Sequence, residues 1–215
     1  MKKILAFDTA SDACSVALLI GSEIKEFFEV VPKQHTGVVM SMVERLLNDA
    51  GLELSELDAL AYSGGPGSFT GIRLSASLVQ GFSFVTKAPI LRISTLRVLA
   101  QEAFHCFGAR QLVVANNAKR QEYYLGVYQA DGELMQELQP DAVVKVSDDN
   151  QQQFKDFIGL GSALVTYGDL SKNLGLKQVL NAPQYSRASY VASLSLSELT
   201  NRTTTVKKIL PNYLY

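Results

Sequence analysis

The chain of 215 residues is poor in cysteine and histidine, and both shortages exclude classes of site. Its two cysteines, Cys14 and Cys106, cannot form a disulfide framework. Neither stands in a CxxC or Cys/His cluster of the zinc type, so both are expected to be small buried hydrophobic residues. The two histidines, His35 and His105, lie far apart, and neither HExxH nor HxxxH occurs. A histidine-bound metal centre is therefore not expected.

Surplus charge and long apolar runs are also missing. Lys and Arg number 20 against 21 Asp and Glu, so no bulk positive charge attracts nucleic acid directly. No run approaches the roughly 18 apolar residues that a spanning helix needs. The apolar start MKKILAF is interrupted by Asp8, Ser11 and Asp12 before the core of a signal peptide could form. We expect a cytoplasmic protein with no membrane partner.

The standard nucleotide-binding motifs fail at the glycine-rich stretch SGGPGSFTG, residues 63–71. A Walker A loop needs a lysine that reaches the outer phosphates, and residues 34–86 contain none. The dinucleotide motif GxGxxG fails because Gly65, Gly67 and Gly71 are spaced one residue too far apart. Two interpretations stay open: backbone amides that bind an anion at a helix start, or close packing against another backbone.

Apolar residues make up 47% of the chain, which is enough to fill a core, and one pattern of strand-like runs occurs twice. The runs ILAFDTA, CSVALLI and EIKEFFEV are strand-like, with a Gly21-Ser22 turn before the last. The runs QLVVANNA, EYYLGVYQA and ELMQELQP follow the same order, with an Asp131-Gly132 turn typical of hairpins. The pattern predicts an α/β fold of two lobes, residues 1–105 and 106–215, with the carboxy-terminal end packing back on the first.

Two predicted helices in the first lobe form the candidate interface. Thr36 is predicted to cap a helix that stops at Gly51, and Ser68 to cap the helix after the glycine loop. Apolar residues cover about half the circumference of the first helix, which is more than packing on one sheet requires. They include Met40 and Met42, whose side chains adapt to contact surfaces. We infer that another protein covers part of this surface; the alternative is a third layer of the same chain. The predicted interface residues are His35, Val38, Val39, Met42, Val43, Leu46, Phe69, Gly71, Ile72, Ser75 and Val79.

A candidate nucleotide contact follows the first predicted strand. Asp8 ends that strand, and Thr9 and Ser11 follow, where an actin-like ATPase has its phosphate-binding hairpin. An alanine stands where such an ATPase has glycine. The matching place in the second lobe holds Asn116 and Asn117, neutral amides that cannot help Asp8 to hold magnesium through paired carboxylates. The hydrolytic machinery is therefore incomplete.

Several segments resemble the bacterial TsaB family, also called YeaZ. They are ILAFDTASDACSVAL, PKQHTGVVMSMVERLLNDAGL, LDALAYSGGPGSFTGIRLSASLVQG, ISTLRVLAQ and NAKRQEYYLGVY, of which GGPGSFTGIR is the most specific. The resemblance implies an actin-like, Hsp70-like ATPase fold of two ribonuclease-H-like lobes. It also implies an inactive relative of TsaD, the catalytic subunit that transfers threonylcarbamoyl to adenosine 37 of tRNAs that read ANN codons.

The same resemblance implies partners and the absence of a metal. TsaD has an HxxxH metal motif where this chain has Thr95 and Leu99, so no catalytic residue and no metal are expected here. TsaD is the implied partner through the two helices, with self-association as a homodimer, TsaE as a further component and tRNA bound only through the complex. No cofactor is implied, except ATP held weakly or at a shared interface. The chain departs from the family pattern at Gly64, Asn117 and Tyr215, where a basic residue, Asp and Arg are usual.

Three functions are therefore compared. The favoured one is a noncatalytic scaffold subunit that binds TsaD. The second is a weak nucleotide-binding or phosphotransfer enzyme built on Asp8, Thr9 and Ser11. The third is a peptidase, for which the sequence offers neither a metal motif nor a Ser-His-Asp pattern with a spacing signal.

Overall fold

The computed structural model describes residues 1–147, 154–181 and 185–200. Tyr215, one of the departures from the family pattern, lies outside the described residues. Within the described ranges, no helix combines the length and the apolar character that crossing a membrane requires.

The chain divides into two compact units. The first contains Met1–Val98 and the described residues from Tyr185 onward, and the second begins at Leu99. The division therefore falls inside a helix, α3, Thr95–Phe107, and not near His105 at its end. The predicted carboxy-terminal helix forms as α6, Ala188–Thr200, and belongs to the first unit.

The first unit is built on a mixed sheet of five strands in the order β3-β2-β1-β4-β5. An antiparallel meander comes first, as the sequence predicts, and two strands parallel to β1 extend the sheet. The β-branched and aromatic residues of these short strands favour their placement in a sheet. The strands are β1 Lys3–Asp8, β2 Ala13–Ile20, β3 Glu23–Val30, β4 Ala59–Ser63 and β5 Ile90–Ile93.

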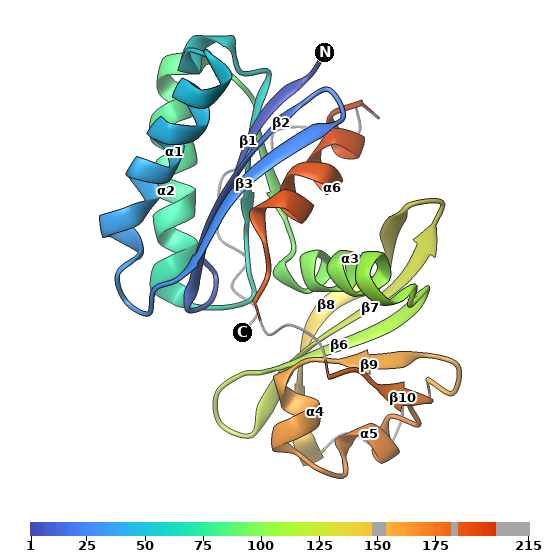
Figure 1. The fold of residues 1–215 in the computed structure, drawn as a ribbon. Coiled ribbons are helices and arrows are strands. Elements are labelled where there is room, and N and C mark those ends of the chain that lie inside the picture. Colours follow the sequence, from blue (N-terminus) through green and yellow to red (C-terminus); the bar gives the residue numbers. More distant parts are fainter. Residues whose placement is uncertain (148–153, 182–184, 201–215) are drawn as a thin grey trace. The chain divides into compact units, whose positions relative to one another are not determined.

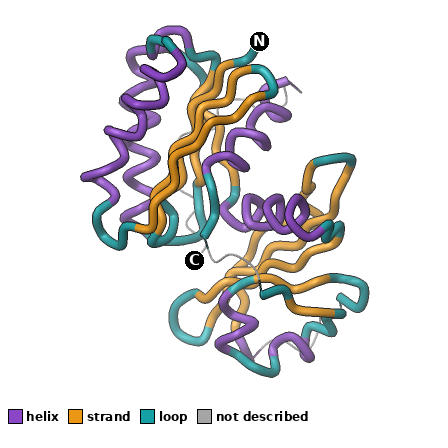
Figure 2. The backbone as a smooth tube through the Cα atoms, in the orientation of Figure 1, coloured by secondary structure: helices purple, strands orange, loops and turns teal. Residues whose placement is uncertain are grey.

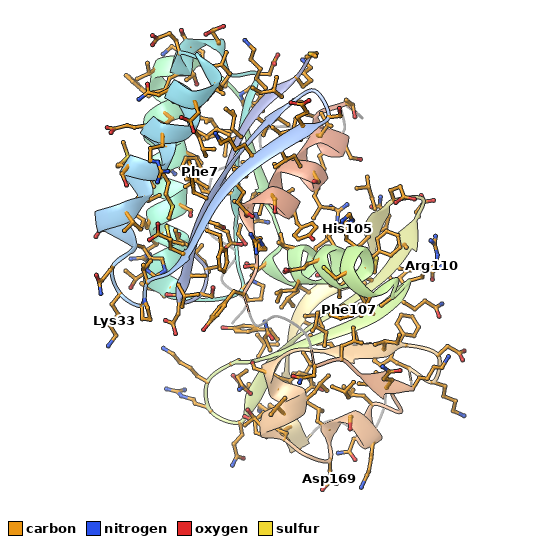
Figure 3. All side chains as sticks on the ribbon, viewed as in Figure 1. Phe7, Lys33, His105, Phe107, Arg110 and Asp169 are labelled. Carbon is orange, nitrogen blue, oxygen red and sulfur yellow. The ribbon has the colours of Figure 1, made fainter. Side chains whose placement is uncertain are left out.

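Helices cover both faces of this sheet. Figure 1 shows α1, His35–Ala50, and α2, Phe69–Thr86, on one face, with α6 on the other. A short helix, η1, Leu54–Glu56, precedes β4. Alternate β1 residues face α1 and α2, and the ring of Phe7 stacks on Phe82 of α2 with centroids 5.9 Å apart (Figure 3). Ile4, Ala6 and Asp8 are the intervening residues, which follows from the two-residue period of a strand.

The helix ends test the predicted caps. The helix α1 ends at Gly51, whose left-handed φ of 61° suits glycine, as predicted. It begins at His35, after Gln34, so the predicted cap by Thr36 is wrong. The Ser68 cap is confirmed, since its hydroxyl accepts a hydrogen bond from the Gly71 amide at 3.3 Å.

The second unit repeats the strand order of the first. Its sheet runs β8-β7-β6-β9-β10, with a meander followed by strands parallel to β6, and α4 and α5 lie on one face (Figure 2). The Asp131-Gly132 turn joins β7 to β8, with Gly132 at a φ of 58°. The elements are β6 Gln111–Asn117, β7 Glu122–Asp131, β8 Leu134–Lys145, β9 Ile158–Leu160, α4 Ser162–Thr166, α5 Leu170–Asn173 and β10 Gln178–Val179. The predicted repeat of the meander is confirmed.

Truncating the buried face of α1 should destabilise the protein. Leu46 is 0% exposed, so Leu46→Ala should lower the free energy of unfolding by about 2–5 kcal/mol through lost burial and a residual cavity. Met40 lies on the outer side of the same helix and is 41% exposed. Met40→Ala should therefore change the free energy of unfolding by less than about 0.5 kcal/mol. Urea unfolding measures both. Equal stability of the two variants would contradict this assignment of the faces.

Candidate functional site

Most of the predicted interface residues lie inside the chain's own core. The apolar stripe of α1 is wide because that helix packs on β2 and β3 and also shares one core with α2. The same chain therefore covers these positions, and a partner cannot touch them on this surface. The residues to which this correction applies are Val39, Met42, Val43, Leu46, Gly71, Ile72, Ser75 and Val79.

Three predicted interface residues are not fully buried. His35 donates from Nε2 to the Ser11 carbonyl oxygen at 2.9 Å, so it ties the start of α1 to the β1–β2 turn. Val38 is half-buried and packs against the core. Phe69 is 51% exposed and is the one clearly available on the surface.

The structure identifies a continuous exposed surface on α2 that we call the outer stripe. At 100° per residue its members lie within an arc of about 120°. The Arg73 guanidinium lies 3.8 Å from the centroid of the Phe69 ring, and Phe84 is 79% exposed. The outer stripe consists of Phe69, Arg73, Ser77, Gly81 and Phe84. Counting helical periods from Phe69 would have found it, but our sequence reasoning followed the apolar residues of α1.

The glycines of α2 serve two different purposes. A methyl group on Gly71 would overlap the carbonyl oxygen of Thr9, so the chain's own packing requires glycine there. A methyl group on Gly81 would meet no described residue within 4 Å, and Gly81 has no positive φ. Glycine inside a helix costs about 1 kcal/mol relative to alanine. Nothing described in this chain accounts for Gly81, which points to close approach by another backbone.

The glycine loop packs on the β1–β2 turn. The Ser68 amide donates to the Ala10 carbonyl oxygen at 2.7 Å, and a methyl group on Gly67 would lie 2.5 Å from that oxygen. The Gly71 amide is engaged by the Ser68 cap, so two amides that an anion site would use are already bonded. These contacts favour the close-packing interpretation. At Gly64, a side chain would overlap that of Arg92.

The predicted nucleotide contacts are not available on the surface. Asp8 is 1% exposed and Thr9 is fully buried. The Thr9 hydroxyl donates to the Gly71 carbonyl oxygen at 2.6 Å and lies 2.6 Å from the Ser75 hydroxyl, which therefore donates to it. Ser11 is half-buried, and its hydroxyl accepts from the Ala13 amide at 3.3 Å. Asp8 and Thr9 are therefore inaccessible to a ligand in this structure, whereas the contact proposed for half-buried Ser11 stays a prediction.

Burial raises the pKa of the Asp8 carboxyl. The nearby Ser186 and Ser63 hydroxyls and the hydrogen bond from the Ala10 amide oppose this rise, whereas the negative charge of Glu26 adds to it. Because the pKa of Asp8 nevertheless lies above its usual value, the effect of burial outweighs the groups that lower it.

Asn116 and Asn117 tie β6 to α4. The Asn116 Oδ1 accepts from the Ser162 amide at 3.1 Å, and the Asn117 Nδ2 donates to the Thr166 hydroxyl at 2.7 Å. The Asn117 amide also donates to the Ser162 hydroxyl at 3.0 Å. An aspartate at 117 would instead accept a hydrogen bond from the Thr166 hydroxyl, so this contact does not explain the departure.

No metal cluster replaces the missing motifs in the part of the chain that is described. Thr95 and Leu99, which stand at the positions of the metal motif, are each 4% exposed. The Thr95 hydroxyl is hydrogen-bonded to that of Ser63 at 2.8 Å. No group of three His, Cys, Asp or Glu side chains within the described residues could hold a metal ion.

The chain matches known proteins over most of its length. A family model described as TsaD, tRNA N6-adenosine threonylcarbamoyltransferase, matches residues 25–171. The TsaB protein of Escherichia coli, named for tRNA threonylcarbamoyladenosine biosynthesis, is 36% identical over 178 residues, which cover 81% of this chain and 77% of that relative. The chain belongs to the TsaB family. The TsaB of Bacillus subtilis is 32% identical over 146 residues, 67% of this chain and 63% of that one.

Solved structures agree with TsaB membership. YeaZ from Pseudomonas aeruginosa is 31% identical, covers both chains completely and superposes with a TM-score of 0.86. A second Pseudomonas aeruginosa structure, described as similar to peptidase YeaZ, is 32% identical with a TM-score of 0.88 and the same coverage. Together with the repeated strand order, these matches confirm the expected α/β fold of two lobes, and the actin-like assignment stays a prediction.

Two alanine substitutions in α2 should change stability in opposite directions. Gly71→Ala should destabilise the TsaB-family chain by about 1–3 kcal/mol, because the added methyl group overlaps the Thr9 backbone. Gly81→Ala should stabilise the free chain by about 1 kcal/mol through higher helix propensity. Thermal and urea unfolding of the isolated protein measure both changes. A Gly81→Ala protein less stable than wild type would show that its own chain requires that glycine.

Proposed function

We propose that this chain is a noncatalytic subunit of tRNA threonylcarbamoyladenosine biosynthesis that binds TsaD and supports threonylcarbamoyl transfer to adenosine 37 of tRNAs that read ANN codons. Family membership and the names of its relatives support the pathway. The observation that carries the binding role is the outer stripe of α2, where exposed aromatic side chains flank a glycine that the described chain does not require.

The dimensions of the outer stripe suit a helical partner. Phe69 and Phe84 are fifteen residues apart, about 22 Å along the helix axis. The small residues Ser77 and Gly81 lie between them and permit a second helix to approach closely. Arg73 and the two aromatic rings are residue types that are enriched at protein interfaces.

The partner's fold is compatible with such pairing. The TsaD family model matches residues 25–171, a span that contains α1 and α2. TsaD is therefore expected to have helices equivalent to these two, and two proteins of one fold can pair like helices about a pseudo-twofold axis.

The remaining assignments follow from this role. A homodimer would use the outer stripe as well, so it would compete with TsaD binding. TsaE joins the assembly and tRNA is contacted only through it, in the cytoplasm. Catalysis is assigned to TsaD, because the residues at the metal-motif positions here are Thr95 and Leu99, both buried. The alternative enzyme would require Asp8 and Thr9 to reach a ligand, and both are buried.

Substitutions in the outer stripe should abolish TsaD binding without unfolding the protein. Phe84→Asp places a charge at the interface, and Gly81→Leu blocks the close approach, so each should weaken binding to the cognate TsaD at least about tenfold, or 1.4 kcal/mol. Val165→Asp is the matched control, since Val165 is an 80% exposed valine on α4 of the second unit. Size-exclusion chromatography and calorimetry of the mixed proteins measure the effect.

Circular dichroism and thermal unfolding should show all three variants folded, because both substituted positions of the stripe are exposed. If Phe84→Asp and Gly81→Leu bind TsaD as tightly as the Val165→Asp control does, the partner surface lies elsewhere on the chain.

A further inference from the structure

A cluster of polar side chains is buried beneath α6, on the face of the first sheet opposite α1 and α2. It lies at the carboxyl ends of the parallel strands β1 and β4, where open α/β sheets place their ligands. Each member is at most 4% exposed. The members are Asp8, Ser15, Ser63, Thr95 and Ser186.

The chain itself closes this cluster with the segment Tyr185–Ser189, which we call the return segment. The Ala188 amide donates to the Ser15 hydroxyl at 2.9 Å. Arg187 donates from Nε and Nη2 to one carboxylate oxygen of Glu26, at 2.9 and 2.7 Å, and its guanidinium lies 4.4 Å from the centroid of the Phe28 ring. The Ser189 amide donates to the other Glu26 oxygen at 3.0 Å. The return segment is therefore held on β2 and β3.

The Asp8 carboxyl beneath the return segment is only half satisfied. Its Oδ1 accepts from the Ala10 amide at 2.9 Å. Its Oδ2 and the nearby Ser186 hydroxyl make no hydrogen bond within the described residues. Burying an ionised carboxylate with an unpaired oxygen is costly, whereas a protonated carboxyl carries a hydrogen that it can donate to a neighbouring hydroxyl. The surroundings favour the neutral form.

We propose that the return segment is a proton-linked latch, which closes over Asp8 while its carboxyl is protonated and opens when the carboxyl ionises. Opening would uncover a carboxylate and several hydroxyls at the end of the sheet. In the closed state described here, the chain's own Ser186 covers that position. The latch is independent of the outer stripe, which lies on the opposite side of the sheet.

The charged and titratable groups around Asp8 act in the same direction. Burial raises the pKa of Asp8, and the negative charge of Glu26 on β3 raises it further. Burial also raises the pKa of the Cys14 thiol on β2 to about 12, so this neighbour stays neutral in the relevant range. Arg187 is paired with Glu26, and it donates no hydrogen bond to Asp8 among the described residues.

The direction of the pH dependence follows from these shifts. Because the pKa of Asp8 is raised in the folded state, closure binds a proton. The stabilisation by the protonated carboxyl is complete below the ordinary aspartate pKa of about 3.9 and is lost as the pH rises through the raised, folded value. The latch therefore weakens as the pH rises from the ordinary aspartate pKa to the raised, folded value, and it does not weaken further above that value.

The test compares Asp8→Asn, which is neutral at every pH, with wild type. Hydrogen exchange of residues 185–195 is measured at matched pH values, so that the intrinsic exchange rate cancels in the ratio. Between about pH 3.9 and the folded pKa, the protection ratio of variant to wild type should rise with pH by up to tenfold per pH unit. Asp12→Asn, an exposed neighbour on the same turn, is the control, and its ratio should stay near one. A ratio for Asp8→Asn that is flat or falls with pH would overturn the proposal.

A second measurement covers the case in which Asp8→Asn does not fold. The side-chain carboxyl carbon of Asp8 in the wild-type protein can be titrated by carbon-13 NMR. The proposal requires a midpoint above the ordinary aspartate value of about 3.9. A midpoint at or below the ordinary value would overturn it, because the closed latch would then hold an ionised carboxylate.

Discussion

The arrangement of the first unit depends on the contact between the β1–β2 turn and the first turn of α2. The Thr9 hydroxyl is bonded to Gly71 and Ser75, and the absence of a side chain at Gly71 lets the two backbones meet. The Ser68 amide adds a bond to the same turn. This contact fixes where α2 begins and how it is rotated. The rotation in turn decides which of its residues enter the core and which form the outer stripe.

The two faces of the first sheet have consequently taken different roles. On the α2 side, α1 and α2 share one buried core, and what remains exposed on α2 is a narrow surface with aromatic ends and a small centre. On the α6 side, the place where a related fold would bind a ligand is filled by the return segment, anchored through Glu26. The proposed partner surface on one face and the closed polar cluster on the other are consistent with the proposed scaffold role in the pathway of its TsaB relatives.

Much of the fold could be predicted from local pattern. Alternating strand-like runs with a Gly21-Ser22 or Asp131-Gly132 turn identified both meanders, because pairing of neighbouring strands needs only short loops. The Ser68 cap was also predictable, because a cap depends only on residues in the first turn of its helix. The cap at Thr36 was not, because the turn before α1 is shaped by the hydrogen bonds of His35 to the β1–β2 turn.

The sequence by itself determined the two-lobed α/β fold, the family resemblance and the absence of the usual catalytic motifs, since these depend on neighbouring residues and their spacing. Only the tertiary structure decided which residues are available. Val39 and Met42 became core because α1 packs on β2 and β3 beside α2, and Asp8 became inaccessible because Ser186 returns over it from the far end of the chain. Burial depends on contacts between distant segments, and no local pattern specifies which segments will meet.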